Sequence, residues 1–226
     1  MATLSTRAIN YLNTLKRATD WMTTADSPEK YLSRYRLEQP DRLLQIQQDY
    51  SGYTFVENAN PDYTIRLYFL SDGIIRKNQK IYYTTINDKA TFSFDNSKTE
   101  PNYLLTENGS VWYWDDAVNQ YFCLYETIET MIEIQALEQE YQYYQSSPVK
   151  YLAKEKSLNI INHMNDHYVF LPECSDKYQY YWLTDFDLIR ITYNDYEEEY
   201  TLHISSISPY NSQLILDGLK RDNLYL

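Results

Sequence analysis

The sequence predicts an α+β fold: a mainly antiparallel β-sheet flanked by helices, with a helical N-terminus and a β-hairpin followed by a C-terminal helix. Segments with apolar residues at helical spacing occur near both ends and in the middle of the chain. The segments between them are short, rich in aromatic and β-branched residues, and separated by turn residues. A chain of 226 residues, 43% of them hydrophobic, can bury a substantial core in one large domain or two small ones.

The first part of the chain is predicted to be helical. Apolar residues between positions 5 and 24 share one helical face, and a second helix is predicted between Pro28 and Pro40. A third helix follows through Tyr50. Gly52 then stands where a left-handed residue ends a helix, before a strand.

The middle of the chain predicts an antiparallel meander. Its strands are separated by "SDG", "ND", "DNSKTEP" and "ENG", which are typical turn sequences. In the last of these, we expect Asn108 and Gly109 both to take positive φ in a type I′ turn. The predicted strands are "YTIRLYFL", "KIYYTTI", "ATFSF", "NYLLT" and "SVWYWD".

Helical spacing returns over about residues 126–145, and the "SSP" at 146–148 then breaks it. We therefore predict a core of residues 1–145 with its N-terminal helices. Residues 146–226 form a strand-and-helix extension that we expect to pack on the core as one unit.

The extension is predicted to begin with a helix through about Met164. Three strands follow, and a last helix is capped by Ser208 with Pro209 at its first position. The strands are "QYYWLT", "DLIRITY" and "EYTLHIS".

The chain is strongly acidic, with 20 Lys plus Arg against 32 Asp plus Glu and a formal net charge of −12. Such a charge repels phosphate backbones and anionic lipids and attracts basic proteins, although acidity also simply favours solubility. There is no secretory signal and no apolar run of about 18 residues, and two cysteines make no disulfide framework. We therefore expect a cytoplasmic protein that binds neither nucleic acid directly nor membranes.

The strand "SVWYWD" carries large side chains on both faces. Trp112 and Trp114 alternate with Val111 and Tyr113, so period-2 polarity is missing. We expect one of the two indoles to pack under a helix, most simply the one that begins near Glu126, while Val111 and Tyr113 face the opposite layer or solvent.

Catalytic motifs are not apparent. His163 and His167 are four residues apart, but the metalloprotease pattern requires Glu after the first histidine, where Met164 stands. No glycine-rich phosphate loop occurs, and Cys123 has the apolar neighbours of a core residue. We therefore predict no catalytic residue, no metal site and no cofactor, although a carboxylate pair at Asp115 and Asp116 leaves a small hydrolase as an alternative.

Acidic residues also cluster in "NDYEEEY", a predicted hairpin tip where tyrosines lie next to them. Acids at an exposed turn project a negative field, and tyrosine offers amphipathic contact area, which suits the docking of a basic partner. The same composition is found in ordinary hydrophilic turns. The residues that we assign to this candidate surface are Tyr196, Glu197, Glu198 and Glu199.

Three stretches in order, "LLQIQQDYSGYTF", "ENGSVWYWD" and "ETIETMIEIQALEQEY", resemble the SUKH superfamily of bacterial toxin-immunity proteins. The resemblance covers about residues 40–145, with Ser51-Gly52 in place of a double glycine and Thr127 in place of the usual serine. It implies an α+β fold and a non-enzymatic role: binding the catalytic domain of a polymorphic toxin, often a nuclease or deaminase. The family has no universal catalytic residues to transfer.

The function that we expect is therefore neutralisation of a cognate, basic toxin by occlusion of its active site. The contacts would come from exposed aromatic anchors with acidic neighbours. A phage-encoded acidic inhibitor of a host nuclease is a second alternative beside the hydrolase. The candidate contacts on the first surface are Trp112, Trp114, Asp115 and Asp116.

Overall fold

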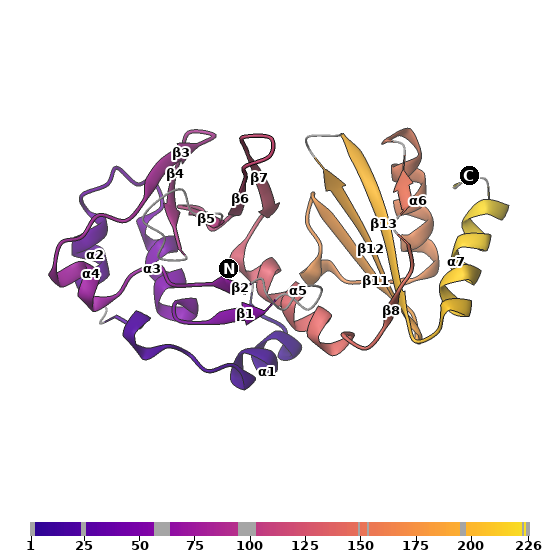
Figure 1. Cartoon of the computed structure of the whole chain (residues 1–226), viewed down its shortest axis with the longest axis horizontal. Helices are drawn as coiled ribbons and strands as arrows, with labels where there is room; N and C mark the ends of the chain where they lie inside the picture. The colour runs from indigo at the N-terminus through magenta and orange to yellow at the C-terminus, as the bar shows by residue number, and fades with distance from the viewer. Residues whose placement is uncertain are drawn as a thin grey trace. The chain divides into compact units, whose positions relative to one another are not determined.

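The computed structural model describes residues 3–23, 26–56, 64–94, 103–148, 150–152, 154–194, 198–222 and 224 (Figure 1). These residues form seven α-helices and three antiparallel sheets, with helix α1 near the N-terminus and α7 near the C-terminus. The predicted α+β class is confirmed. In the described part of the chain, no helix is both long enough and apolar enough to cross a membrane.

Two compact units make up the chain, Met1–Ala136 and Leu137–Leu226. The boundary between the two units falls within helix α5 (Ile128–Glu140). The packing of the C-terminal part on the core as one unit stays a prediction.

The first unit contains a two-stranded sheet and a five-stranded meander in the order β3-β4-β5-β6-β7. Its helices are α1 (Thr6–Thr14), the 3-10 turn η1 (Thr19–Trp21), α2 (Asp26–Leu32), α3 (Pro40–Tyr50) and α4 (Asp72–Arg76), with most of α5. Its strands are β1 (Thr54–Val56), β2 (Thr64–Arg66), β3 (Tyr83–Ile86), β4 (Lys89–Ser93), β5 (Tyr103–Thr106), β6 (Val111–Asp115) and β7 (Gln120–Tyr125).

The predicted helix over residues 5–24 is wrong beyond Thr14. Leu15 is extended, and the chain continues to Ala18, whose N–H donates to the carbonyl of Gly52 at 2.8 Å. Arg17 donates to the carbonyls of Gln48 and Ser51, both at 2.6 Å, and so bonds the C-terminal end of α3. These tertiary bonds take the place of a further helical turn.

The "ENG" turn also differs from the prediction. Gly109 has φ +94°, but Asn108 does not have positive φ, so the turn is not type I′. The Gly109 N–H donates to the carbonyl of Thr106, as in a turn whose last residue alone is left-handed. The paired left-handed residues of a type I′ turn occur instead at Asn87 and Asp88, between β3 and β4.

A buried ion pair lies in the core of the first unit. The guanidinium of Arg42 on α3 donates through Nη1 to Glu129 Oε1 at 3.0 Å and through Nη2 to Glu129 Oε2. The Glu129 side chain on α5 is only 7% exposed. A Cβ at Gly109 would lie 2.8 Å from Arg42 Nε, so the turn must approach the guanidinium without a side chain. Burial raises the pKa of the Tyr50 phenol, and the negative charge of Glu129 raises it further.

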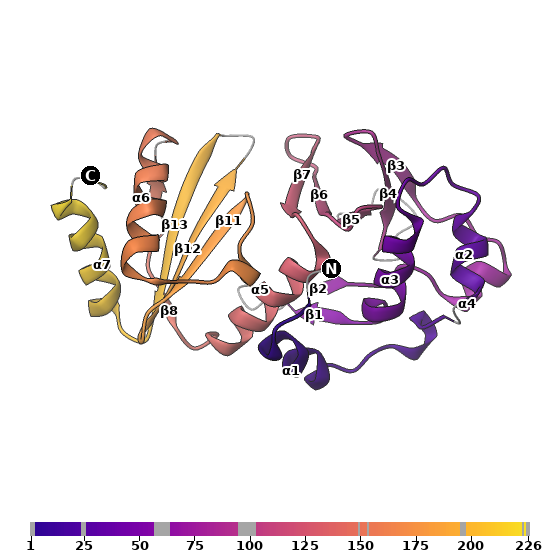
Figure 2. The same cartoon turned by 180° about the vertical axis from the view of Figure 1, so that it is seen from behind.

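The second unit contains a sheet in the order β10-β11-β12-β13-β8, with β9 also paired to β13. Helices α6 and α7 lie on the same face of this sheet (Figures 1 and 2), and their apolar residues share one core with Trp182, Ile189 and Ile204. Its elements are β8 (Gln145–Ser146), β9 (Lys150–Leu152), α6 (Lys154–His167), β10 (Val169–Phe170), η2 (Pro172–Cys174), β11 (Gln179–Leu183), β12 (Asp187–Asn194), β13 (Glu199–Ser206) and α7 (Pro209–Arg221).

Helix α7 begins at Pro209, as predicted. Ser208 occupies its N-cap position, but the Ser208 side chain makes no capping hydrogen bond. The predicted cap is therefore correct in position and wrong in its bond.

The other face of the second sheet carries a polar cluster. Arg190 Nη1 donates to Glu138 Oε1 at 2.9 Å, and Arg190 stands opposite His203 in the register of β12 and β13. Burial is the main cause that lowers the pKa of His203 to about 4, and the positive charge of Arg190 is the second cause. His203 is therefore neutral in the folded protein near pH 7.

Replacing Glu129 with Gln should destabilise the first unit by about 3 kcal/mol, because Arg42 would keep a buried charge without its counter-ion. Chemical denaturation at neutral pH measures this change. The matched control is Glu38→Gln, which breaks the exposed Lys89–Glu38 pair and should leave the unfolding midpoint nearly unchanged. Equal effects of the two substitutions would contradict the role assigned to the buried pair.

The depressed pKa of His203 predicts a stability loss in acid. Between pH 6.5 and about 4 the unfolded chain binds a proton at this position and the folded chain does not, so His203 contributes less stability as pH falls through this window. Partial exposure limits the effect to about 1–2 kcal/mol. The His203→Gln variant should therefore lose less stability than the wild-type protein when the pH is lowered from 7 to 4.5. Equal losses of the two proteins, measured by thermal unfolding, would refute this.

Candidate functional site

The candidate site lies at the end of the β6–β7 hairpin, and we define the hairpin surface as Trp112, Trp114, Asp115, Asp116 and Tyr121. Both indoles are half-buried, and neither belongs to the apolar core of the first unit. Asp115 and Asp116 follow directly at the end of β6, and Asp116 is exposed. The sequence-predicted contacts of this hairpin are therefore brought together.

The face assignment of β6 was predicted the wrong way round. Val111 is fully buried and belongs to the core that includes Ile128 and Met131 of α5. Register explains the reversal: Val111 pairs with Leu105 and Tyr125, which also contact this core, and a β-bulge separates Val111 from Trp112. The indoles therefore project away from the layer that contains α5.

Each indole has a defined hydrogen-bond acceptor. Trp112 Nε1 donates to Ser110 Oγ at 2.9 Å, and Trp114 Nε1 donates to Asp116 Oδ1 at 2.7 Å. The ring of Trp114 contacts that of Tyr121 on β7, with centroids 4.6 Å apart. The Tyr121 hydroxyl in turn lies 3.1 Å from the Tyr82 hydroxyl. This set of contacts fixes the orientation of Trp114 before any partner binds.

The two aspartates do not converge on a common point for acid–base chemistry. Asp115 Oδ1 accepts the N–H of Ala117 at 2.8 Å, and Asp116 Oδ1 accepts the Trp114 indole N–H. Each carboxylate thus bonds locally within the turn and keeps its second oxygen for solvent or a partner. This arrangement suits recognition of a cation beside an aromatic ring.

The second candidate surface, at the β12–β13 turn, is described only in part. Tyr196 and Glu197 lie outside the described residues. Glu198 has φ +51°, and Glu199 is exposed at the start of β13 opposite Asn194. Below them Tyr193 and Tyr200 pair across the strands with ring centroids 4.7 Å apart.

The histidine pair singled out in the sequence does share one face of α6. The rings of His163 and His167 stack with centroids 4.1 Å apart. Among the described residues, no group of three or more His, Cys, Asp or Glu is arranged to hold a metal ion. Cys123 and Cys174 are both buried, as expected for Cys123.

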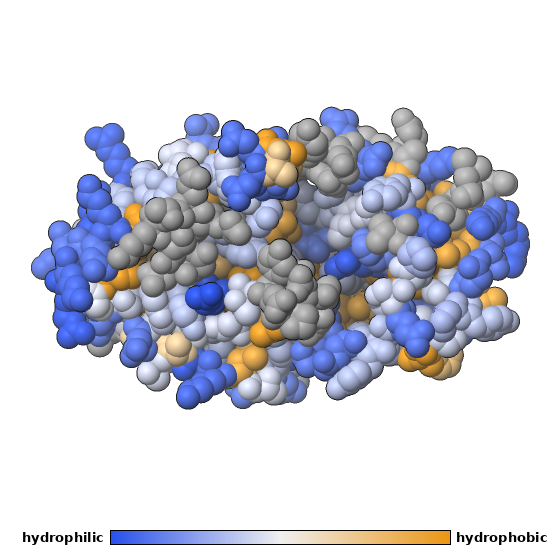
Figure 3. All heavy atoms as spheres, viewed as in Figure 1, coloured by the Kyte–Doolittle hydropathy of each residue, from blue (hydrophilic) through white to orange (hydrophobic). Residues whose placement is uncertain are grey.

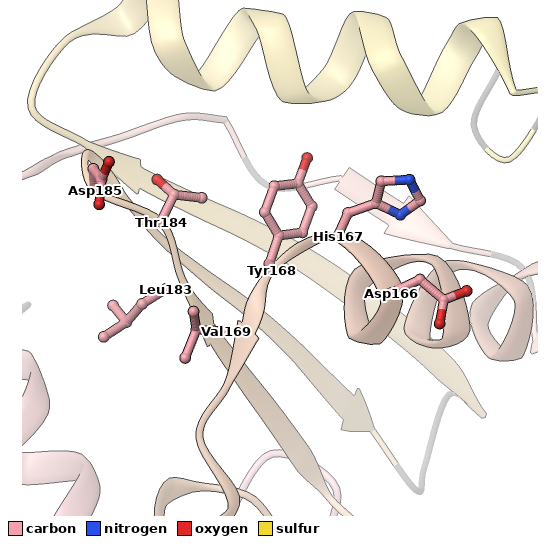
Figure 4. A pocket seen from close by; sticks show the side chains of 7 residues that line it. All are labelled: Asp166, His167, Tyr168, Val169, Leu183, Thr184 and Asp185. Carbon is pink, nitrogen blue, oxygen red and sulfur yellow. The ribbon is translucent and has the colours of Figure 1, made fainter.

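The second unit also has a surface depression of about 540 Å³ near the end of α6 (Figure 4). Its acids, Asp166 and Asp185, are exposed to solvent and lie at opposite ends of the view. They are not a close carboxylate pair. The lining residues are Asp166, His167, Tyr168, Val169, Leu183, Thr184 and Asp185.

No protein-family model matches the chain, and no curated protein or solved structure has significant similarity to it.

Tyr82 and Tyr121 were missed as parts of the site. "QYFCLY" was not identified as a strand, so nothing placed Tyr121 opposite Trp114. Its β-branched and aromatic content, together with the polar "DDAVNQ" before it, was a usable hairpin signal.

Trp114 should contribute little to folding. Trp114→Ala should cost about 1 kcal/mol, because the indole is half-buried outside the core. Trp182→Ala, the matched control, should cost about 4 kcal/mol because Trp182 is fully buried and bonds Asn165. Denaturant unfolding of both variants tests the contrast, and a large loss for Trp114→Ala would mean that the ring serves packing.

Proposed function

We propose that this protein is a non-enzymatic immunity protein that binds a cognate, basic toxin domain and neutralises it by covering its active site. The observation that carries the proposal is the hairpin surface, where two half-buried indoles outside the core adjoin the half-buried Asp115 and the exposed Asp116. A toxin domain that acts on nucleic acid needs a basic groove, and such a groove is complementary to this surface.

The charge of the whole chain supports the same partner. A formal charge of −12 accelerates encounter with a basic protein. Hydrophilic side chains cover much of the coloured surface in Figure 3, with smaller hydrophobic patches between them. At a tight interface, charge usually guides the encounter of the partners, and a few aromatic rings supply most of the binding energy.

The geometry of Trp114 supports a role as the anchor. Its indole N–H is bonded to Asp116 and one side of its ring contacts Tyr121, so little side-chain freedom remains to be lost on binding. The neighbouring carboxylates can accept hydrogen bonds from Arg or Lys of the partner. The resemblance to the SUKH superfamily over about residues 40–145 adds a family-level reason for the same proposal.

The test is affinity for the toxin domain encoded by the adjacent gene. Trp114→Ala should weaken binding by at least about 2 kcal/mol, mainly through faster dissociation, as expected for an aromatic anchor. The control is Tyr210→Ala on α7, which removes a ring that is 71% exposed elsewhere and should leave affinity unchanged. Isothermal titration and surface plasmon resonance both measure the difference.

Charge is tested separately. The double variant Asp115→Asn with Asp116→Asn should slow association and flatten its salt dependence, with a smaller effect on dissociation. Failure of the wild-type protein to bind or inhibit the toxin domain encoded by the adjacent gene would refute the proposed function. Binding that is unaffected by both the Trp114 and the aspartate variants would refute the site alone.

A further inference from the structure

The depression in the second unit has acids at its two ends and apolar side chains between them. It lies where α6 ends and where β11 turns into β12, and its volume is about 540 Å³. Asp166 and Asp185 are exposed at opposite ends of the view in Figure 4, with Tyr168, Val169 and Leu183 between them. The described lining includes neither lysine nor arginine, so no permanent positive charge of the lining offsets these acids.

A buried carboxylate lies beside this depression. Asp187, the first residue of β12, is only 5% exposed. Thr184, which lines the depression, donates through its hydroxyl to Asp187 Oδ2 at 2.7 Å and accepts the backbone N–H of Asp187 at 2.8 Å. Asp187 Oδ1 is buried and accepts no hydrogen bond from the described residues. A buried carboxylate oxygen without a donor is rare in proteins, and a positively charged group is its most favourable partner.

The sheet directs Asp187 to the side on which the two helices lie. Asp187 and Ile189 are two residues apart in β12 and so share a face, and Ile189 packs in the core that α6 and α7 cover. Tyr168 packs against the same core, and Figure 4 shows Tyr168 and Thr184 extending together toward α7. Burial raises the pKa of the Tyr168 phenol, and the negative charge of Asp187 raises it further. The charge of Asp187 therefore acts on a side chain that lines the depression.

This arrangement suits an elongated organic cation better than a metal ion. A metal ion requires ligands that converge on one point, and among the described residues no group of three or more His, Cys, Asp or Glu does so. A linear polyamine spreads its positive charges along an aliphatic chain. Its ammonium groups can therefore meet separate carboxylates while its methylene groups contact apolar side chains and an aromatic ring.

We propose that the depression binds a linear polyamine, with Asp166 and Asp185 holding its terminal ammonium groups and Asp187 supplying a third, buried negative charge. The site uses residues of the second unit alone. It is therefore independent of the hairpin surface and of the proposed immunity function. Because Asp187 is buried, salt screens its charge less than it screens the charges of the exposed acids.

The experiment is a calorimetric titration of the full chain with spermidine in about 0.15 M salt, which weakens binding to scattered surface acids. Asp187→Asn should weaken the affinity at least about fivefold, because it removes a poorly screened negative charge. The asparagine keeps an oxygen for the Thr184 hydroxyl, so the variant should fold, as circular dichroism and thermal unfolding would show. The matched control is Asp217→Asn, an exposed position of α7 outside the lining, which should leave the affinity unchanged.

The two ends of the site have their own test. Asp166→Asn and Asp185→Asn should each weaken spermidine binding at least about threefold, and the monocation n-butylamine should bind the wild-type protein at least about tenfold more weakly than spermidine. Equal spermidine affinities of the wild-type protein, Asp187→Asn and Asp217→Asn would overturn the site and show adventitious binding to the overall negative charge. Absence of saturable binding at millimolar spermidine would overturn it as well.

Discussion

The first unit is organised around a buried charge pair. Arg42 on α3 and Glu129 on α5 are 87 residues apart in sequence and meet through a two-bond contact where neither can be fully solvated. Because each buried charge requires the other, the two helices have one acceptable register. Gly109 extends the constraint to the meander, since its missing side chain leaves room for the guanidinium at the β5–β6 turn. One ion pair thus fixes the mutual positions of two helices and a hairpin.

Local patterns predicted most elements of the fold, because period and turn chemistry act over a few residues. The α5 helix, strands β3 to β6 of the meander and the strands β11, β12 and β13 of the second sheet are predicted in this way. The predicted meander strand "YTIRLYFL" is wrong, because of its described residues only Thr64–Arg66 form a strand, which pairs with β1 in a separate sheet. The errors have tertiary causes. The first helix stops at Thr14 because Arg17 and Ala18 bond the segment that follows α3. The sequence predicts a turn at "SDG", where the structure has helix α4 with Ser71 as its N-cap, accepting the N–H of Ile74.

The surroundings of the candidate hairpin surface could be predicted only in part from the sequence. Alternation along β6 correctly separates Val111 from the indoles, but it contains no information on which face meets the core. That choice depends on pairing with Leu105 and Tyr125 across two neighbouring strands, which no local pattern encodes. The hydrogen bond from Trp114 to Asp116, by contrast, joins residues two positions apart at the end of a strand. Such a bond can be predicted from the local sequence alone.

The acidic excess does not act only at the surface. Glu107 is buried and accepts backbone N–H groups of Gln39 and Ala90, each at 3.1 Å, and Glu133 accepts the hydroxyl of Ser5 at 2.6 Å. With Glu129, these carboxylates satisfy donors inside the first unit, and their charged form is stabilised there by hydrogen bonds. The field that reaches a partner comes instead from exposed acids such as Asp116. Neutralising a buried acid therefore changes stability, whereas neutralising an exposed one changes association rate and salt dependence. A charge scan of this protein separates folding from recognition only if it keeps the two groups of acids apart.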